Sequence, residues 1–225
     1  MPRADDAVLH WLIPLEAEPG EYETLLSILD DEQRARAMRI VDPWRRAAWV
    51  TAWAGARQRL GACLDCRPEE IRFVRDAWGK PHIPDLPLHF NLSHSGRFCL
   101  LAASFSRPVG ADLERWREKL DFAGLARRCF STAEQDWWES LSESSRIPAF
   151  FQLWTCKEAF VKAAGQGIRL GLSRCEFDLG GEPRLVAVPP GCGAAQDWRI
   201  RIFPMPEGYS AALALRLTDD NQKNP

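Results

Sequence analysis

Three carboxylates at two separate places in the chain have the residue types and spacing of a metal site. Asp112 and Glu114 are two residues apart within residues 109–114, a stretch that reads as a short strand. Side chains two apart on a strand leave the same face, so these carboxylates can converge while Val109, Ala111 and Leu113 face a core. The third carboxylate, Glu158, belongs to a later stretch that reads as a helix.

The predicted helix adds a positive charge to this group. Lys162 follows Glu158 by four residues, which puts the two side chains one turn apart on a common helix face. Oxygen ligands suit Mg²⁺, which commonly takes one or two carboxylates together with substrate phosphates. A solvated strand face is the alternative for Asp112 and Glu114, and the presence of Glu158 and Lys162 disfavours it. The pattern indicates phosphoryl-type transfer.

Arginines are concentrated in residues 34–59, where seven of them accompany a single acidic residue, Asp42. One interpretation is a solvated helix face, because charge on helices is usually solvation. The other is a site for a phosphate-bearing ligand, because the arginine fork matches phosphate oxygens bidentately. The sequence leaves both open.

Composition limits the classes of protein that need considering. The chain has 225 residues, enough for one large domain or two small ones, and its 46% hydrophobic and 27% charged residues are ordinary for a globular protein. The net charge of -2 argues against bulk nucleic-acid binding. No apolar run approaches the roughly 18 residues of a membrane span, and the chain start lacks a signal-peptide pattern, so we expect no membrane partner and a cytoplasmic location.

The seven cysteines are an odd number scattered through segments that resemble core. Reduced thiols are the simpler interpretation. Cys63 and Cys66 form a lone C-x-x-C without a second pair, and the histidines lack zinc-finger spacing, which disfavours a zinc or redox role.

Apolar periodicity and capping signals predict two α+β halves, residues 1–107 and 108–225, each with a helix laid on a short sheet. A weak echo between residues 96–103 and 208–215 supports this duplication. Residues 93–96 are predicted as a turn and residues 142–146 as a polar loop. The predicted strands are 8–15, 71–75, 88–92, 98–104, 109–114, 175–179, 198–203 and 209–217, and the predicted helices are 21–28, 31–39, 43–60, 122–129, one from Ser131 with Glu134 in a capping box, and one ending at Gly165.

Five motifs in order carry a resemblance to a known family. They are Gly79-Lys80-Pro81, the Phe-Asn-Leu-Ser-His-Ser run at 90–95, the carboxylate strand at 109–114, Phe130-Ser131-x-x-Glu134, and the segment at 154–167 that includes Lys157, Glu158 and Lys162. With these motifs, nearly the whole chain closely resembles the 4'-phosphopantetheinyl transferases of the surfactin-synthetase (Sfp) type.

This resemblance implies an activity and an architecture. The family moves the 4'-phosphopantetheine arm of coenzyme A onto a serine of an acyl or peptidyl carrier protein and releases adenosine 3',5'-bisphosphate. The implied fold is a pseudo-twofold monomer of two α+β halves with the active site in the cleft between them. Which carrier is served is not implied.

The resemblance also implies roles for the carboxylates. Asp112, Glu114 and Glu158 would hold Mg²⁺, with Mn²⁺ as an alternative ion, against the coenzyme A pyrophosphate. Lys162 would bind or protonate the departing phosphate. Either Glu158 or Glu134 would take the proton from the carrier serine, and a capping-box glutamate such as Glu134 also has a purely structural explanation.

The remaining implied roles concern coenzyme A. Arg36 and Arg46 would grip its 3'-phosphate, with Arg39 and Arg45 as rivals, although Gln33 stands where relatives often carry a lysine. The other implied contacts are Ser93 and His94 with the phosphates, Gly79, Lys80 and Pro81 along the adenine and phosphate region, and Lys157 in the same pocket.

Two other functional classes compete with this hypothesis. A two-metal phosphodiesterase could use a carboxylate trio, but it would not explain Gly79-Lys80-Pro81 or the Ser93-His94 pair. A non-catalytic carrier-binding module would have no need of the intact set of carboxylates with Lys162.

Overall fold

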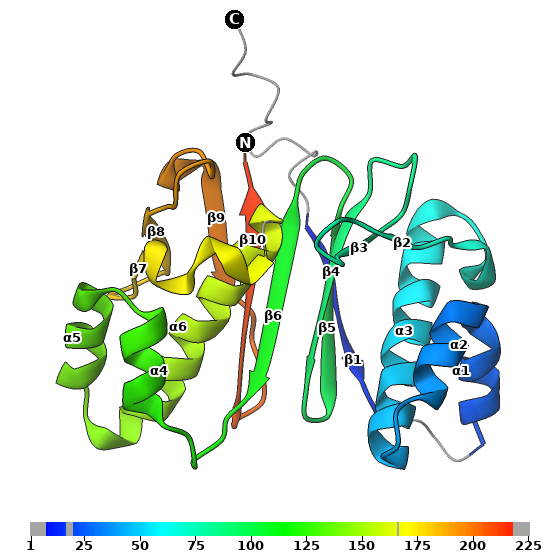
Figure 1. The fold of residues 1–225 in the computed structure, drawn as a ribbon, viewed down its shortest axis with the longest axis horizontal. Coiled ribbons are helices and arrows are strands. Elements are labelled where there is room, and N and C mark those ends of the chain that lie inside the picture. The colour runs from blue at the N-terminus through cyan, green and yellow to red at the C-terminus, as the bar shows by residue number, and fades with distance from the viewer. Residues whose placement is uncertain (1–7, 17–19, 166, 218–225) are drawn as a thin grey trace, which may run out of the picture.

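Two three-stranded antiparallel sheets form the centre of the molecule in the computed structural model, which describes residues 8–16, 20–165 and 167–217 (Figure 1). The first sheet has the order β1-β5-β4 and the second β6-β10-β9. The first comprises β1 (Leu9–Pro14), β4 (His89–Ser95) and β5 (Phe98–Ser104), and the second β6 (Val109–Arg115), β9 (Trp198–Ile202) and β10 (Tyr209–Arg216). Two small hairpins pair β2 (Val74–Arg75) with β3 (Pro81–His82) and β7 (Glu176–Asp178) with β8 (Arg184–Ala187).

Helices cover the outer face of each sheet, so the layers run helix, sheet, sheet, helix (Figure 1). The N-terminal helices are α1 (Tyr22–Ile28), α2 (Asp31–Met38) and α3 (Pro43–Leu64), and the C-terminal ones are α4 (Phe122–Cys129), α5 (Thr132–Ser140) and α6 (Glu143–Ala164). Alternate side chains of β5 point to opposite faces of its sheet and pack into two different cores. Leu101 packs with the α3 layer, whereas Leu100 packs with apolar residues of β6 and β10. The predicted α+β class with two similar halves is confirmed.

The two segments of the weak internal echo become equivalent strands. Residues 98–104 form β5 and residues 209–216 form β10, and each is the central strand of its sheet. Central strands are covered on both faces, which explains why both read as nearly continuous apolar runs. The echo therefore reflects equivalent positions in the two halves.

Capping side chains hold the starts of helices α2 and α3. The side chain of Asp30 accepts the Gln33 N–H at 2.8 Å at the start of α2, and Asp42 accepts the Arg45 N–H at 2.7 Å at the start of α3. Gly165 ends α6 in the left-handed conformation, with φ 74°. All seven cysteines are free thiols, as expected. Within the described ranges, no helix is both long and apolar enough to cross a membrane.

Several predicted boundaries were wrong: the strand predicted at 71–75 is confined to Val74 and Arg75, the helix predicted at 43–60 continues to Leu64, and two segments predicted as turn or loop belong to regular elements. Strand β4 continues through Ser95, and the turn is confined to Gly96 and Arg97, because the Ser93 and Ser95 hydroxyls find partners on a neighbouring strand. Helix α6 begins at Glu143 and contains Pro148, whereas residues 142–146 were expected to form a loop. The loss of a helical N–H at Pro148 falls near the helix start, where Arg146 donates to the carbonyls of Glu139 and Leu141 and holds the first turn in place.

Gly110 allows α6 to approach β6 closely. A Cβ atom at this position would lie 2.0 Å from the carbonyl oxygen of Ala159, which is part of the rigid α6 backbone. The contact therefore requires a residue without a side chain, and any larger residue must push the helix away from the strand.

We predict that Gly110→Ala destabilises the protein by about 3 kcal/mol, since overpacking against backbone cannot be relieved by a rotamer change. Thermal unfolding followed by circular dichroism measures this effect. Gly181→Ala is the matched control, because a Cβ there meets no atom within 4 Å. Equal melting temperatures for the two variants would contradict the close approach.

Candidate active site

The face of β6 that is turned toward α6 carries the predicted carboxylates. Val109, Ala111 and Leu113 point the other way, into the core between the two sheets, as predicted. Gly110, Asp112 and Glu114 occupy the alternate positions of the strand, and Gly110 brings α6 against them.

Asp112 is the most enclosed of the three carboxylates, with 4% of its surface exposed. Its Oδ1 accepts hydrogen bonds from Ser93 Oγ at 2.8 Å and from Lys162 Nζ at 2.5 Å. Its Oδ2 is buried without a hydrogen-bond partner in the described part of the chain. A buried carboxylate oxygen without a partner is costly, so this atom is available to a ligand.

The other two carboxylates have raised pKa values. Burial and then the nearby charge of Asp112 raise the pKa of Glu114, whose Oε2 accepts a hydrogen bond from Ser95 Oγ at 3.0 Å. Burial and then Asp112 also raise the pKa of Glu158, and the positive charge of Lys162 partly offsets this. The cations near the three carboxylates are the Lys162 ammonium and, 3.8 Å from Glu114, the largely exposed Arg117 guanidinium. Three carboxylates thus face two cations, one of them screened by solvent.

This donor set fits a hard divalent cation. Among the described residues, no three histidine, cysteine or acidic side chains are gathered closely enough to hold a metal ion as they stand. The Lys162 ammonium instead makes an ion pair with Asp112, the contact that a cation would otherwise supply. Mg²⁺ suits this site for three reasons: the Oδ2 atom of Asp112 has no partner, the carboxylates repel one another, and all the available ligand atoms are oxygens.

A ladder of side chains from β4 joins the two sheets beside these carboxylates. We call Asn91, Ser93 and Ser95 the seam ladder, because their side-chain oxygens accept the backbone N–H groups of alternate residues of β6. The three distances are 2.9 Å to the N–H of Ala111, 3.3 Å to that of Leu113 and 3.0 Å to that of Arg115. The family resemblance implied that Ser93 contacts ligand phosphate, and the sequence analysis gave no role to Asn91 and Ser95, although their spacing of two was a usable signal.

A hollow lies on one side of the carboxylates, at the end of α6. We call it the lysine hollow; it is lined by Trp78, Gly79, Lys80, Pro81, Asn91, Val161, Lys162, Gly165 and Gly167. Lys80 Nζ donates to the carbonyl oxygen of Lys162 at 2.8 Å, and burial lowers the pKa of Lys80. The structure thus brings the Gly79-Lys80-Pro81 motif and Lys162 into one hollow.

Two adjoining hollows lie on the other side and share Trp44, His94, Ser95 and Gly96; together we call them the histidine hollow. One end is lined by Glu114 and the other by Arg45. Of the predicted arginines, Arg36 and Arg46 line none of the hollows described here. Arg46 donates instead to the carbonyl of Ile40 at 2.9 Å.

Glu134 and Lys157 form a buried ion pair away from these hollows. Lys157 Nζ lies 2.7 Å from Glu134 Oε2 and also donates to the carbonyls of Leu172 and Cys175 at 2.9 Å and 2.5 Å. Glu134 additionally accepts the N–H groups of Ser131 and Phe177. Every donor of Lys157 is engaged in the core, so Lys157 does not line the ligand pocket where it was expected. The same contacts support the structural alternative for Glu134.

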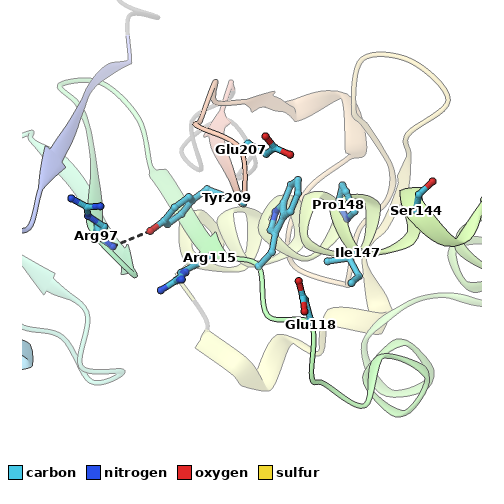
Figure 2. A pocket seen from close by; sticks show the side chains of 10 residues that line it. Arg97, Arg115, Glu118, Ser144, Ile147, Pro148, Glu207 and Tyr209 are labelled. Carbon is cyan, nitrogen blue, oxygen red and sulfur yellow. Dashed lines mark hydrogen bonds between the residues drawn. The ribbon is translucent and has the colours of Figure 1, made fainter.

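A further hollow opens just beyond Glu114, where β6 ends (Figure 2). Arg115 and Trp116 line it together with Ile147 and Pro148 from the first turns of α6. Tyr209 closes one side, and its hydroxyl accepts the backbone N–H of Arg97 at 3.1 Å, which ties the two halves together at this end.

Comparison with known proteins gives consistent matches across both halves. The family model described as the 4'-phosphopantetheinyl transferase superfamily matches residues 108–214, and the model described as 4'-phosphopantetheinyl transferase, N-terminal, matches residues 15–106. The 4'-phosphopantetheinyl transferase HetI of Nostoc sp. is 36% identical over 167 residues, which cover 72% of this chain and 70% of the relative.

Two further relatives extend the comparison. The putative 4'-phosphopantetheinyl transferase slr0495 of Synechocystis sp. is 34% identical over 225 residues, covering 94% of this chain and 88% of the relative. The 4'-phosphopantetheinyl transferase Sfp of Bacillus subtilis is 32% identical over 160 residues, covering 71% of this chain and 69% of the relative.

The raised pKa of Glu158 predicts a pH-dependent penalty in metal-free protein. An unfolded glutamate titrates at about 4.3, so between that pH and the raised pKa of the folded state the folded protein holds more protons and loses stability as the pH rises. We expect Glu158→Gln to melt about 2–4 °C above the parent in EDTA at pH 7.5, equivalent to ~1 kcal/mol, and this difference to shrink toward pH 5.

Scanning calorimetry of both proteins over this pH range measures the difference. Glu139→Gln is the control, since Glu139 is an exposed residue of α5. A Glu158→Gln variant that melts below the parent at pH 7.5 would show that the three carboxylates do not repel one another.

Proposed function

The chain belongs to the 4'-phosphopantetheinyl transferase superfamily, enzymes that transfer phosphopantetheine from coenzyme A to carrier proteins, and we propose that the carboxylate cluster between its two halves is the catalytic centre. The observation that carries the proposal is Asp112, a buried carboxylate with one oxygen paired to Lys162 and the other left without a partner. The reacting group of coenzyme A is a pyrophosphate, which also needs positive charge around it.

Mg²⁺, with Mn²⁺ as an alternative, would be held by Asp112, Glu114 and Glu158. When bound, such an ion would neutralise pyrophosphate charge as a Lewis acid. The residues present suit it, because their own charges repel one another and one buried oxygen lacks a partner. The protein would contribute the enclosed setting in which these charges act most strongly.

Lys162 would stabilise the charge that develops on the departing 3',5'-bisphosphate. Its side chain is 28% exposed, and it lines the lysine hollow while reaching Asp112, so it stands between ligand space and the carboxylates. Glu158 is the favoured proton acceptor for the carrier serine hydroxyl. Glu158 is partly exposed beside the other two carboxylates, whereas Glu134 is only 2% exposed and fully occupied by its partners.

Coenzyme A would span the two hollows around the carboxylates. Lys80, with Gly79 and Pro81, offers a partly desolvated ammonium and close backbone approach in the lysine hollow. In the histidine hollow, Arg45 lies at one end, Arg115 and Arg117 lie at the other beside Glu114, and His94 lies between them. Of the four arginines considered for the 3'-phosphate, only Arg45 lines this hollow, which favours it over Arg36 and Arg46.

The proposal also covers the type of transferase, the boundary between the halves, the cellular location and the oligomeric state. We assign the enzyme to the Sfp type, with halves that meet at residues 107 and 108, supported by family matches to both halves and by the resemblance to Sfp. We further propose that it works in the cytoplasm as a monomer, supported by hollows lined from both halves of one chain.

The activity is tested by incubating the protein with coenzyme A, Mg²⁺ and an apo carrier protein, then weighing the carrier by mass spectrometry. We expect a mass gain of one phosphopantetheine group. Asp112→Asn should lower the rate by at least about 10²-fold with an unchanged circular dichroism spectrum, whereas Asp136→Asn, an exposed change in α5, should not. No gain on acyl and peptidyl carriers alike would refute the proposal.

The assignment of Arg45 is tested by comparing coenzyme A with its 3'-dephospho form. Loss of a charged hydrogen bond to phosphate costs about 1.5–3 kcal/mol, so Arg45→Ala should raise KM for coenzyme A at least tenfold and leave KM for the dephospho form within about twofold. Arg59→Ala, an exposed change on α3, is the control. If Arg36→Ala or Arg46→Ala instead gave the selective effect, the family-based assignment would replace ours.

A further inference from the structure

The seam ladder has a chemical feature that the joining of two strands does not require. Ser93 and Ser95 each use both capacities of a hydroxyl group. The oxygen of Ser93 accepts the N–H of Leu113 and its proton goes to Asp112, while Ser95 accepts the N–H of Arg115 and donates to Glu114.

The third member of the ladder shows what the other two add. Asn91 accepts the N–H of Ala111 in the same way, but the neighbouring position on that face of β6 is Gly110, which has no carboxylate to orient. The donor function therefore coincides with the two positions where β6 carries a carboxylate. An amide side chain suffices at the remaining position.

We infer that Ser93 and Ser95 are positioning residues for the cation site, so that the contact between the two halves and the affinity for the cation depend on the same two hydroxyl groups. This inference rests on the proposed function, because it concerns the carboxylates assigned to the metal. Ser95 is the sharper case, since its hydroxyl is the only neutral hydrogen-bond donor that the structure gives to Glu114 within the described residues.

The geometry explains how the positioning works. Glu114 is half-buried near the end of β6 and has three side-chain torsions, so its carboxylate needs an anchor to stay on the α6 side. Arg117 lies 3.8 Å away and is 59% exposed, which makes it a weak anchor. Ser95 is itself fixed by the N–H of Arg115, so its proton has a defined direction.

The test measures cation affinity directly. Mn²⁺ is titrated in the presence of coenzyme A while the electron paramagnetic resonance signal of the free ion is followed. Partners that orient metal ligands typically contribute 10–100-fold to affinity, so Ser95→Ala should raise the Kd for Mn²⁺ by about tenfold or more. Ser95→Thr, which keeps the hydroxyl, should remain within about threefold of the parent. Ser104→Ala, in the neighbouring strand β5, is the matched control.

Amide hydrogen exchange separates positioning from a purely structural role. In the parent, saturating Mn²⁺ with coenzyme A should slow exchange at Leu113 and Arg115, and in Ser95→Ala this protection at Arg115 should be lost. Faster exchange in Ser95→Ala with an unchanged Kd for Mn²⁺ would overturn the inference and leave Ser95 as a structural contact. A parent protein that binds no Mn²⁺ would instead refute the proposed metal site, and the inference with it.

Discussion

The two halves of this molecule meet through side chains at a place where strands usually meet through backbone. Strand β6 is the edge of its sheet, and the N–H groups on its free side are satisfied by Asn91, Ser93 and Ser95 of β4. An edge strand with unpaired backbone groups is a liability, and the ladder removes it. Because the contact is made by side chains, the hydroxyls of Ser93 and Ser95 also reach the carboxylates of Asp112 and Glu114 on β6.

The electrostatics of the site follow from this arrangement. Asp112 is buried because α6 approaches β6 at Gly110, and that burial is tolerable because Lys162 and Ser93 share one of its oxygens. Their own burial, and then the field of this poorly screened charge, raise the pKa values of Glu114 and Glu158. The site thus holds more negative charge than the protein neutralises, a state that favours cationic ligands.

Local patterns in the sequence were enough to predict those parts of the site that depend on a single strand or helix. The common face of Asp112 and Glu114 follows from the period of a strand, and that of Glu158 and Lys162 from the period of a helix. The turn predicted at residues 93–96 took in three strand residues, 93–95, because a run of small polar residues is typical of loops. The partners that keep these residues extended lie about twenty residues further along the chain. The contacts of Lys157 and the reach of Arg45 depend on packing between distant segments, which periodicity does not encode.

Lys157 and Glu158 are consecutive residues of α6 with unrelated tasks. One is fixed in the core by Glu134 and two carbonyl groups, and the other faces the carboxylates of β6, about 100° around the helix axis. A rotation that improved either contact would spoil the other. The rotation of α6 about its own axis is therefore fixed by contacts on two sides. Changes in the size of its core residues have to be accommodated by shifts of α4, α5 or the small hairpin of β7 and β8, and not by turning the helix that carries the site.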